Sequence, residues 1–239
     1  HSVDVGTLCG HGCRYCSTPC TIRDQRALKE TGLTAQELFS GGYSVLDTDT
    51  PNRIPATVEN LKQNDIVMFC PKTDGWSPES QKLNLGKQCL EAVLTNNSHC
   101  KVRVLSKNAT MANDLAALVQ YKDRIMPSLS LTAPRSKSYL AQVVEPNAST
   151  IVERLAAMKQ IHALGFRMFG MCCPAIPGLL TDEADIEELL EEILRFNPDT
   201  IWLEAVNGRG SGLGDTEAAF RDAGHKAIAN KIEAIRETA

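Results

Sequence analysis

Three cysteines close to the start of the chain, Cys9, Cys13 and Cys16, are the residues best suited to chemistry. They form a C-x3-C-x2-C run, and three thiolates on one short segment can hold three irons of a [4Fe–4S] cluster. The fourth iron then has no protein ligand from this run, so it is free to bind another molecule. An iron with an open position is a reaction site, whereas a fully ligated cluster normally carries electrons. The spacing therefore predicts a reactive iron–sulfur centre.

A zinc site is the alternative for this segment. Cys20 is a fourth cysteine within the first 20 residues, and four thiolates are a common zinc ligand set. Structural zinc sites usually use two cysteine pairs that are well separated in sequence. Here all four cysteines lie on one turn-rich segment, so the spacing favours a cluster over zinc. His11, between the first two cysteines, is expected to be a loop residue that packs or hydrogen-bonds nearby and not a ligand.

Composition places the chain among ordinary globular proteins. With 239 residues, 43% of them hydrophobic and 23% charged, it can bury a sizeable core as one α/β domain. No apolar run is long enough to span a membrane, and no signal-peptide pattern is present. The odd number of nine cysteines argues against a disulfide framework and indicates a reducing, cytoplasmic setting.

Strand-like and helix-like segments alternate along the chain. Strands are expected at 2–8, 65–70, 101–106, 124–131, 166–173 and 199–204. Helices are expected at 79–94, 111–121, 150–164, 182–196 and 217–236. For the helix at 150–164 we expect Ser149 as the N-cap and Gly165 as the glycine that ends it.

Six strands separated by helices predict parallel β/α units, in either an open sheet or a curved barrel. In such folds the chemistry lies at the carboxyl ends of the strands, and the cysteine segment follows the first strand. We expect one domain over 1–239, with a core at about 2–204 and a helical extension at about 215–239. The less regular region 41–55 is interpreted as a lid or an insertion.

The cysteine run, with the aromatic Tyr15 before the third cysteine, resembles the radical S-adenosylmethionine (radical SAM) superfamily. Further segments, all in the same order along the chain, resemble its spore photoproduct lyase-like branch. The resemblance covers about Thr7 to Leu180 and implies the partial (β/α)6 TIM-type barrel of radical SAM enzymes. The segments are 69–79 with its Thr73-Asp74 pair, 104–108, 128–132, Glu145-Pro146, Arg154-Leu155 and 174–178.

The resemblance also implies a reaction. Cys9, Cys13 and Cys16 would bind the [4Fe–4S] cluster, and the open iron would bind the amine and carboxylate of SAM. One electron from a flavodoxin or ferredoxin type of reductant would cleave SAM to a 5′-deoxyadenosyl radical. This radical would abstract hydrogen from a substrate at the mouth of the barrel.

The contacts expected for SAM follow from its chemistry. Its ammonium group needs acceptors, its carboxylate a cation, its ribose small polar partners, and its adenine an apolar wall. The respective candidates are Thr73 and Asp74; Lys107; Ser128 and Ser130; and Tyr15 with Ala175, Ile176 and Pro177. Plainer interpretations exist, because an Asp-Gly pair is common in turns and a lysine is often solvated. In the same way, Glu145 and Arg154 could form a purely structural pair.

Cys70 is the candidate for a further catalytic role. In the branch that this chain resembles, a hydrogen-donating cysteine lies just before the threonine–aspartate segment, and Cys70 lies about one residue from that place. We therefore hypothesise that Cys70 donates a hydrogen atom to a substrate radical. Cys172 and Cys173 are neighbours on a strand and face opposite sides, so one of them could face the barrel interior.

The resemblance suggests a nucleic-acid lesion or a modified nucleoside as substrate. The net charge of −4 does not favour this, because duplex binding is dominated by phosphate contacts. A radical SAM enzyme acting on a small molecule or peptide stays open, as does a non-catalytic iron–sulfur or zinc protein. The glycine-rich loop 208–214 could close over a substrate or be a mobile surface loop. The basic residues available for a local patch are Arg23, Arg26, Lys29, Arg135, Lys137 and Arg209.

Overall fold

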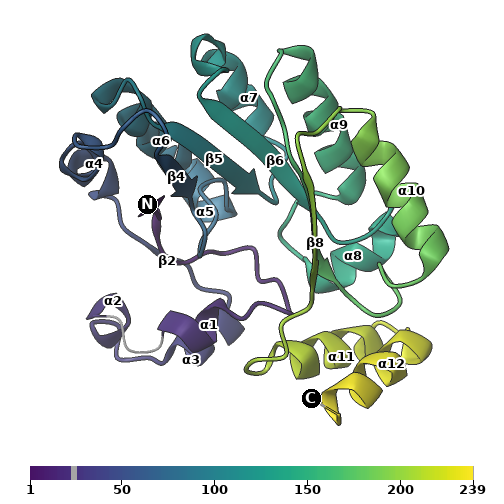
Figure 1. Ribbon diagram of the computed structural model, residues 1–239. Helices are drawn as coiled ribbons and strands as arrows, with labels where there is room; N and C mark the ends of the chain where they lie inside the picture. Colours follow the sequence, from purple (N-terminus) through teal and green to yellow (C-terminus); the bar gives the residue numbers. More distant parts are fainter. Residues whose placement is uncertain (23–25, 239) are drawn as a thin grey trace.

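A parallel sheet of six strands forms the centre of the protein in the computed structural model (Figure 1), which describes residues 1–22 and 26–238. Every neighbouring pair in the order β1-β4-β5-β6-β7-β8 is parallel. The edge strands β1 and β8 do not pair with each other in the described part of the chain, so the barrel is unclosed. The strands are β1 (Ser2–Val3), β4 (Ile66–Phe69), β5 (Lys101–Ser106), β6 (Ile125–Leu131), β7 (Gly170–Ala175) and β8 (Ile201–Ala205).

Helices cover one face of this sheet, and the opposite, concave face is exposed along β4 (Figure 1). On β4, Val67 and Phe69 are buried, whereas Ile66 and Met68 are 51% and 38% exposed. Alternate residues of a strand point to opposite faces, so the exposed side chains mark the concave inner face. The covering helices are α4 (Thr50–Val58), α5 (Pro78–Lys82), α6 (Leu85–Asn96), α7 (Met111–Ala117), α8 (Ser138–Val144), α9 (Ile151–Ala163) and α10 (Glu183–Leu194).

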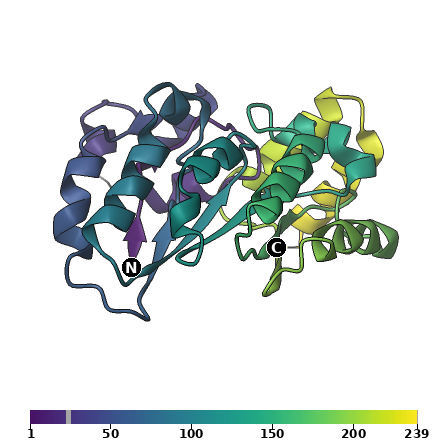
Figure 2. The same ribbon diagram turned by 90° about the horizontal axis from the view of Figure 1, so that it is seen from above.

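Shorter elements lie at the two ends of the sheet. Figure 2 shows the amino-terminal helices at one end of the molecule and the carboxyl-terminal helices at the other. Two strands outside the main sheet, β2 (Gly6–Leu8) and β3 (Val45–Leu46), pair antiparallel. The terminal helices are α1 (Thr18–Ile22), α2 (Arg26–Lys29), α3 (Ala35–Ser40), α11 (Gly212–Asp222) and α12 (Lys226–Arg236), and two 3-10 turns occupy Val119–Tyr121 and Arg135–Lys137.

Three predicted helices are interrupted in the structure. The segment 79–94 divides into α5 and α6 because Asn84 between them adopts a left-handed conformation with φ of 52°. The segment 217–236 divides into α11 and α12 at Gly224, whose φ of 84° also ends a helix. The segment 111–121 ends its α-helix at Ala117 and continues as a 3-10 turn.

The helix predicted at 150–164 is confirmed, but its N-cap is Thr150 and not Ser149. Thr150 and Glu153 form a reciprocal capping box, in which each side chain accepts a hydrogen bond from the other residue's backbone N–H. The hydroxyl of Ser149 instead accepts a hydrogen bond from the backbone N–H of Ala109. Gly165 ends the helix as predicted, with φ of 82°.

The segment 41–55, interpreted above as a lid or an insertion, forms part of two regular elements. It contains β3, which pairs with β2, and the start of α4, which packs against α6. The predicted first strand likewise divides, since β1 belongs to the main sheet while β2 leaves it to pair with β3. The strand predicted to begin at Phe166 begins at Gly170. Within the described residues, no helix is both long and apolar enough to cross a membrane.

Candidate active site

Cys9, Cys13 and Cys16 line one cavity of about 190 Å³ at the carboxyl ends of the sheet strands. The cysteine segment reaches this place because β1 ends beside β4 and the chain then passes over the strand ends (Figure 1). Parallel strands bring the residues that follow them to the same edge. The cavity is also lined by His11, Tyr15, Cys70, Pro71, Lys72, Thr73, Asp74, Leu105, Ser106, Lys107, Ser130, Cys173 and Pro174.

Two thiols of this cavity, those of Cys9 and Cys13, lie in an environment that disfavours a bare negative charge. Burial and the negative charge of Glu145 raise the pKa of Cys13 to about 12. Burial, together with the charge of Asp74, also raises the pKa of Cys9 well above its usual value. Iron binds thiolates, so cluster binding must release these protons and supply the compensating positive charge.

This donor set fits a cluster better than a single zinc ion. The ligands of a cluster bind different irons, so their sulfurs do not need to converge on one point. Among the described residues, no group of three or more histidine, cysteine, aspartate or glutamate side chains is arranged to hold one metal ion. Cys20 is not a cavity residue: its sulfur packs against Gly210, where an added side chain would collide with it.

Asp74 connects the cysteine loop to strand β5. Its carboxylate accepts hydrogen bonds from His11 Nε2 and from the backbone N–H of Lys107, both at 2.8 Å. It also accepts from the Ser106 hydroxyl and the Trp76 backbone N–H, again at 2.8 Å. Burial opposes ionisation, but the charge and hydrogen bonds of these neighbours outweigh it and lower the pKa of Asp74. His11 is therefore a loop residue, as predicted, and the contact of Asp74 with SAM stays a prediction.

Glu145 and Arg154 form a fully buried ion pair behind the cavity. The Tyr15 hydroxyl also donates a hydrogen bond to Glu145. Burial alone would raise the pKa of Glu145, but the charges of Arg154 and Lys107 lower it to about 2. Arg154 further donates to the backbone carbonyl of Ser130 at 2.6 Å. This pair thus joins the cysteine loop to β6 and to helix α9.

Lys107 brings a positive charge to the cavity wall. Its Nζ lies 3.0 Å from Glu145 Oε1, donates to Ser130 Oγ at 2.8 Å, and donates to the backbone carbonyl of Cys173 at 3.2 Å. The Ser130 hydroxyl donates to that same carbonyl at 2.7 Å. These bonds fix an ammonium group at the place where the sequence predicted a partner for a carboxylate.

Four predicted contacts do not line this cavity. Ser128 is fully buried, and its hydroxyl reaches only the backbone carbonyl of Leu129, at 3.5 Å. Ala175 ends β7, Ile176 and Pro177 follow it, and the residue of this segment that lines the cavity as an apolar wall is Pro174. The contacts of these four residues with SAM stay predictions.

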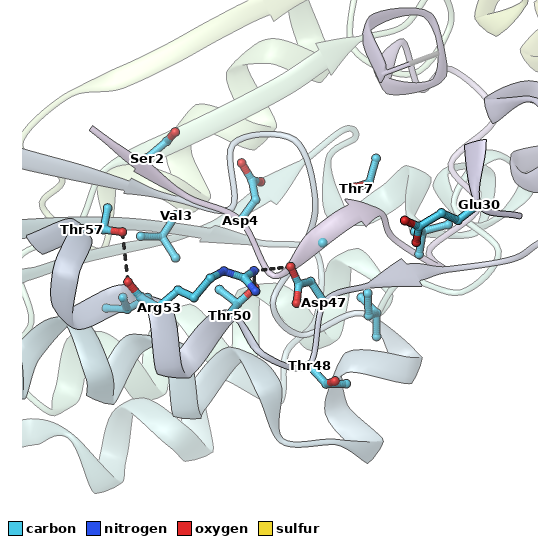
Figure 3. Close-up of a pocket in the computed structure, with 14 residues that line it drawn as sticks. Ser2, Val3, Asp4, Thr7, Glu30, Asp47, Thr48, Thr50, Arg53 and Thr57 are labelled. Atoms are coloured by element: carbon cyan, nitrogen blue, oxygen red, sulfur yellow. Dashed lines mark hydrogen bonds and ion pairs between the residues drawn. The ribbon is translucent and has the colours of Figure 1, made fainter. Parts of the chain in front are cut away.

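The sequence interpretation missed Asp4. Its Oδ1 accepts hydrogen bonds from the backbone N–H groups of Lys72 and Thr73 and from the Thr73 hydroxyl, at 3.1–3.2 Å. Asp4 also lines a separate, polar cavity of about 520 Å³, in which Arg53 pairs with Asp47 (Figure 3). The sequence did contain a signal for this role, because Asp4 is a carboxylate at the end of the first predicted strand. In the structure, the end of that strand lies beside the threonine–aspartate segment.

No protein-family model and no curated protein matches this chain. Several solved structures match it, among them a double mutant of spore photoproduct lyase with bound AdoMet and dinucleoside spore photoproduct. That chain is 16% identical, with a TM-score of 0.62. This chain has the fold of spore photoproduct lyase. The predicted partial barrel is thereby confirmed.

Two further structures of spore photoproduct lyase, a cysteine-to-serine mutant and a tyrosine-to-phenylalanine mutant, match equally well. Each is 15% identical with a TM-score of 0.62, and 92% of this chain is covered in all three comparisons. The match covers 60–61% of the spore photoproduct lyase chains, so this chain corresponds to about three fifths of their length.

Proposed function

We propose that this chain is a radical SAM enzyme that holds a [4Fe–4S] cluster on Cys9, Cys13 and Cys16. The observation that carries the proposal is that these thiols share one cavity with Lys107 and Ser130, at the strand ends of a partial barrel. When bound, the cluster and SAM together supply one-electron cleavage of SAM to a 5′-deoxyadenosyl radical that abstracts hydrogen from a substrate.

The chain's own residues position the cofactor. Lys107 presents its ammonium group to the SAM carboxylate, and Glu145 keeps that group in place. The Ser130 hydroxyl, also on the cavity wall, is a partner for the ribose. Asp74 holds the cysteine loop against β5 through His11, so the three thiols keep a fixed relation to Lys107.

Cys70 is our proposed donor of a hydrogen atom to the substrate radical. Its side chain lines the cysteine cavity, and its backbone N–H donates to the carbonyl of Val3 in the edge strand. Burial raises the pKa of the Cys70 thiol, so the sulfur keeps the hydrogen that this role requires. The left-handed φ of 55° at Cys70 directs this residue out of β4 at the point where the strand ends.

The substrate and partners are also proposals. Spore photoproduct lyase has been solved with a dinucleoside lesion, which supports a nucleic-acid lesion or a modified nucleoside here. Arg135 and Lys137 are paired with Glu192 and Asp185, and this favours a smaller substrate over a long duplex. Arg23 and the side chain of Arg26 lie outside the described residues. We propose a flavodoxin or ferredoxin type of reductant and a reducing, cytoplasmic setting.

The decisive experiment is anaerobic reconstitution of the cluster, followed by EPR of the reduced protein with and without SAM. We expect a [4Fe–4S]⁺ signal that changes when SAM is added, together with formation of 5′-deoxyadenosine. The Cys13→Ala variant should lose the cluster signal, whereas Cys20→Ala should keep it because Cys20 packs outside the cavity. A signal that ignores SAM, or a colourless zinc protein, would contradict the proposal.

A further inference from the structure

Arg103 on β5 lies between two aromatic rings on the concave face of the sheet. Its guanidinium carbon is 4.0 Å from the ring centre of Phe169 and 4.2 Å from that of Trp202. Trp202 belongs to β8, which is three strands from β5 in the sheet order. The side chain therefore crosses the inside of the curved sheet, where the two rings hold it in one orientation.

The stacked guanidinium keeps its hydrogen-bonding capacity. Arginine has five N–H donors, and stacking on a ring face occupies none of them. Within residues 1–22 and 26–238, Arg103 forms no side-chain hydrogen bond or ion pair with another residue. Arg103 is itself only half-buried, and the adjacent Trp202 is 43% exposed, so the donors can be reached by a molecule that enters the concave face.

Arg103 is on β5, the strand that leads directly to Lys107, the proposed carboxylate partner of SAM. It precedes Lys107 by four residues, which corresponds to about 13 Å along a β-strand. Glu204 on β8 is close to both sites: its Oε2 is 3.5 Å from the sulfur of Cys173, which lines the cysteine cavity, and its negative charge acts on Arg103. A group bound at Arg103 would thus leave the rest of its molecule room to reach that cavity.

We propose that Arg103, held by Phe169 and Trp202, is an oxyanion-binding site that anchors a phosphate or carboxylate group of the substrate. A guanidinium binds either group through two parallel N–H···O hydrogen bonds, and a stacked guanidinium loses little freedom on binding. The anchoring role rests on the proposed function, whereas binding of an oxyanion at Arg103 does not. The competing explanation is that the stack only joins β5 to β7 and β8.

Calorimetric titration of the full chain with phenyl phosphate, benzoate and benzamide tests the site. The three probes share a ring, and benzamide is the neutral counterpart of benzoate. We expect benzamide to bind at least tenfold more weakly than benzoate, and stronger binding of one anion identifies which group the site prefers. Equal binding of benzoate and benzamide, or no binding of either anion, would overturn the proposal.

Variants separate the anion site from a purely structural stack. Arg103→Met keeps the packing stem and should weaken anion binding at least tenfold, and Arg103→Lys should give an intermediate loss. Glu204→Gln should strengthen it several fold, because the negative charge of Glu204 acts on Arg103. Arg195→Met, a 65% exposed arginine beyond the end of α10, should change nothing. Anion affinity that survives in Arg103→Met contradicts the proposal.

Anion titration of the protein with and without the cluster, together with an assay of 5′-deoxyadenosine, distinguishes failure of this site from failure of the proposed reaction. Anion binding that depends on Arg103, in a protein that forms no 5′-deoxyadenosine with SAM, supports the site and contradicts the radical SAM reaction. Formation of 5′-deoxyadenosine together with anion binding that is unchanged in Arg103→Met supports the reaction and contradicts the site.

Discussion

Buried charge organises the residues around the cysteine cavity. Glu145 and Arg154 are both fully buried, and such pairs are strongly destabilising to break because the remaining charge loses its partner. Lys107 shares Glu145 with Arg154, so its ammonium group stays at the cavity wall. The Glu145 carboxylate therefore both stabilises Arg154 and positions Lys107, the proposed partner of SAM.

The first prediction concerns the pH dependence of stability. The pKa of Glu145 is lowered from 4.5 to about 2 by Arg154 and Lys107, against the effect of burial. A depressed carboxyl pKa stabilises the fold above pH 4.5, and this contribution disappears as the pH falls toward 2. We expect the free energy of unfolding, measured by urea titration, to fall by about 3 kcal/mol more in the native chain than in Glu145→Gln over this range. Equal pH profiles would contradict the assignment.

The second prediction concerns hydrogen transfer. Replacing Cys70 by alanine should change the product distribution while leaving SAM cleavage intact, because the thiol lines the cavity without belonging to the cysteine run. The measurement is chromatography of substrate products and of 5′-deoxyadenosine from the same reaction. Cys89→Ala is the matched control, since Cys89 is equally buried but lies on α6, outside the cavity. Unchanged products in Cys70→Ala would refute the role.

At the scale of elements, the start of α6 supports the loop that carries Asp74. A methyl group at Gly86 would lie 2.2 Å from the backbone carbonyl oxygen of Gly75, which is far inside normal contact distance. The helix and the loop can approach this closely only because both residues are glycine. The orientation of Asp74, and through it of the cysteine loop, thus depends on the packing of a helix end.

Gly86→Ala should therefore lower the free energy of unfolding by about 1–3 kcal/mol and weaken the effect of SAM on the EPR signal. The reason is that the backbone of the 70–76 loop must move to admit the methyl group. Gly214→Ala in α11 is the control, because nothing lies near its added methyl group. Chemical denaturation and the EPR titration measure the two effects, and equal stability of both variants would show that the loop moves freely.

At the scale of the whole molecule, charge disfavours tight binding of undamaged DNA. The net charge is −4, and the surface arginines Arg53, Arg167 and Arg221 are each paired with acidic residues. Non-specific duplex binding depends on free cations that displace counterions. The open concave face, with Arg103 in it, offers a local site for one anionic group instead.

We expect undamaged duplex DNA to bind with a dissociation constant weaker than about 10 μM at physiological salt. Fluorescence anisotropy with a labelled duplex measures this, and a salt series gives the number of phosphate contacts. Arg195→Met, which removes an exposed surface charge, serves as a reference for non-specific effects. Tight binding that falls steeply with salt would show that a larger basic surface exists.

The amino-acid sequence by itself determined which cysteines are the candidates for a cluster, the alternation of strands and helices, and the order of the motifs. These are local features: the spacing of Cys9, Cys13 and Cys16 restricts the cofactor, and apolar runs such as 101–106 form strands wherever they pack. The sequence pattern did not predict the helix breaks at Asn84 and Gly224. One residue with positive φ can end a helix inside an otherwise regular pattern.

Only the tertiary structure decided which side chains meet. Whether Ser128 or Ser130 faces the cavity depends on the strand ends, which periodicity does not locate. Asp4 reaches Thr73 because β1 pairs with β4 across more than 60 residues, and Arg103 meets Trp202 because the sheet curves. Such contacts depend on strand order and curvature, which arise from packing of the whole sheet and leave no local pattern in the sequence.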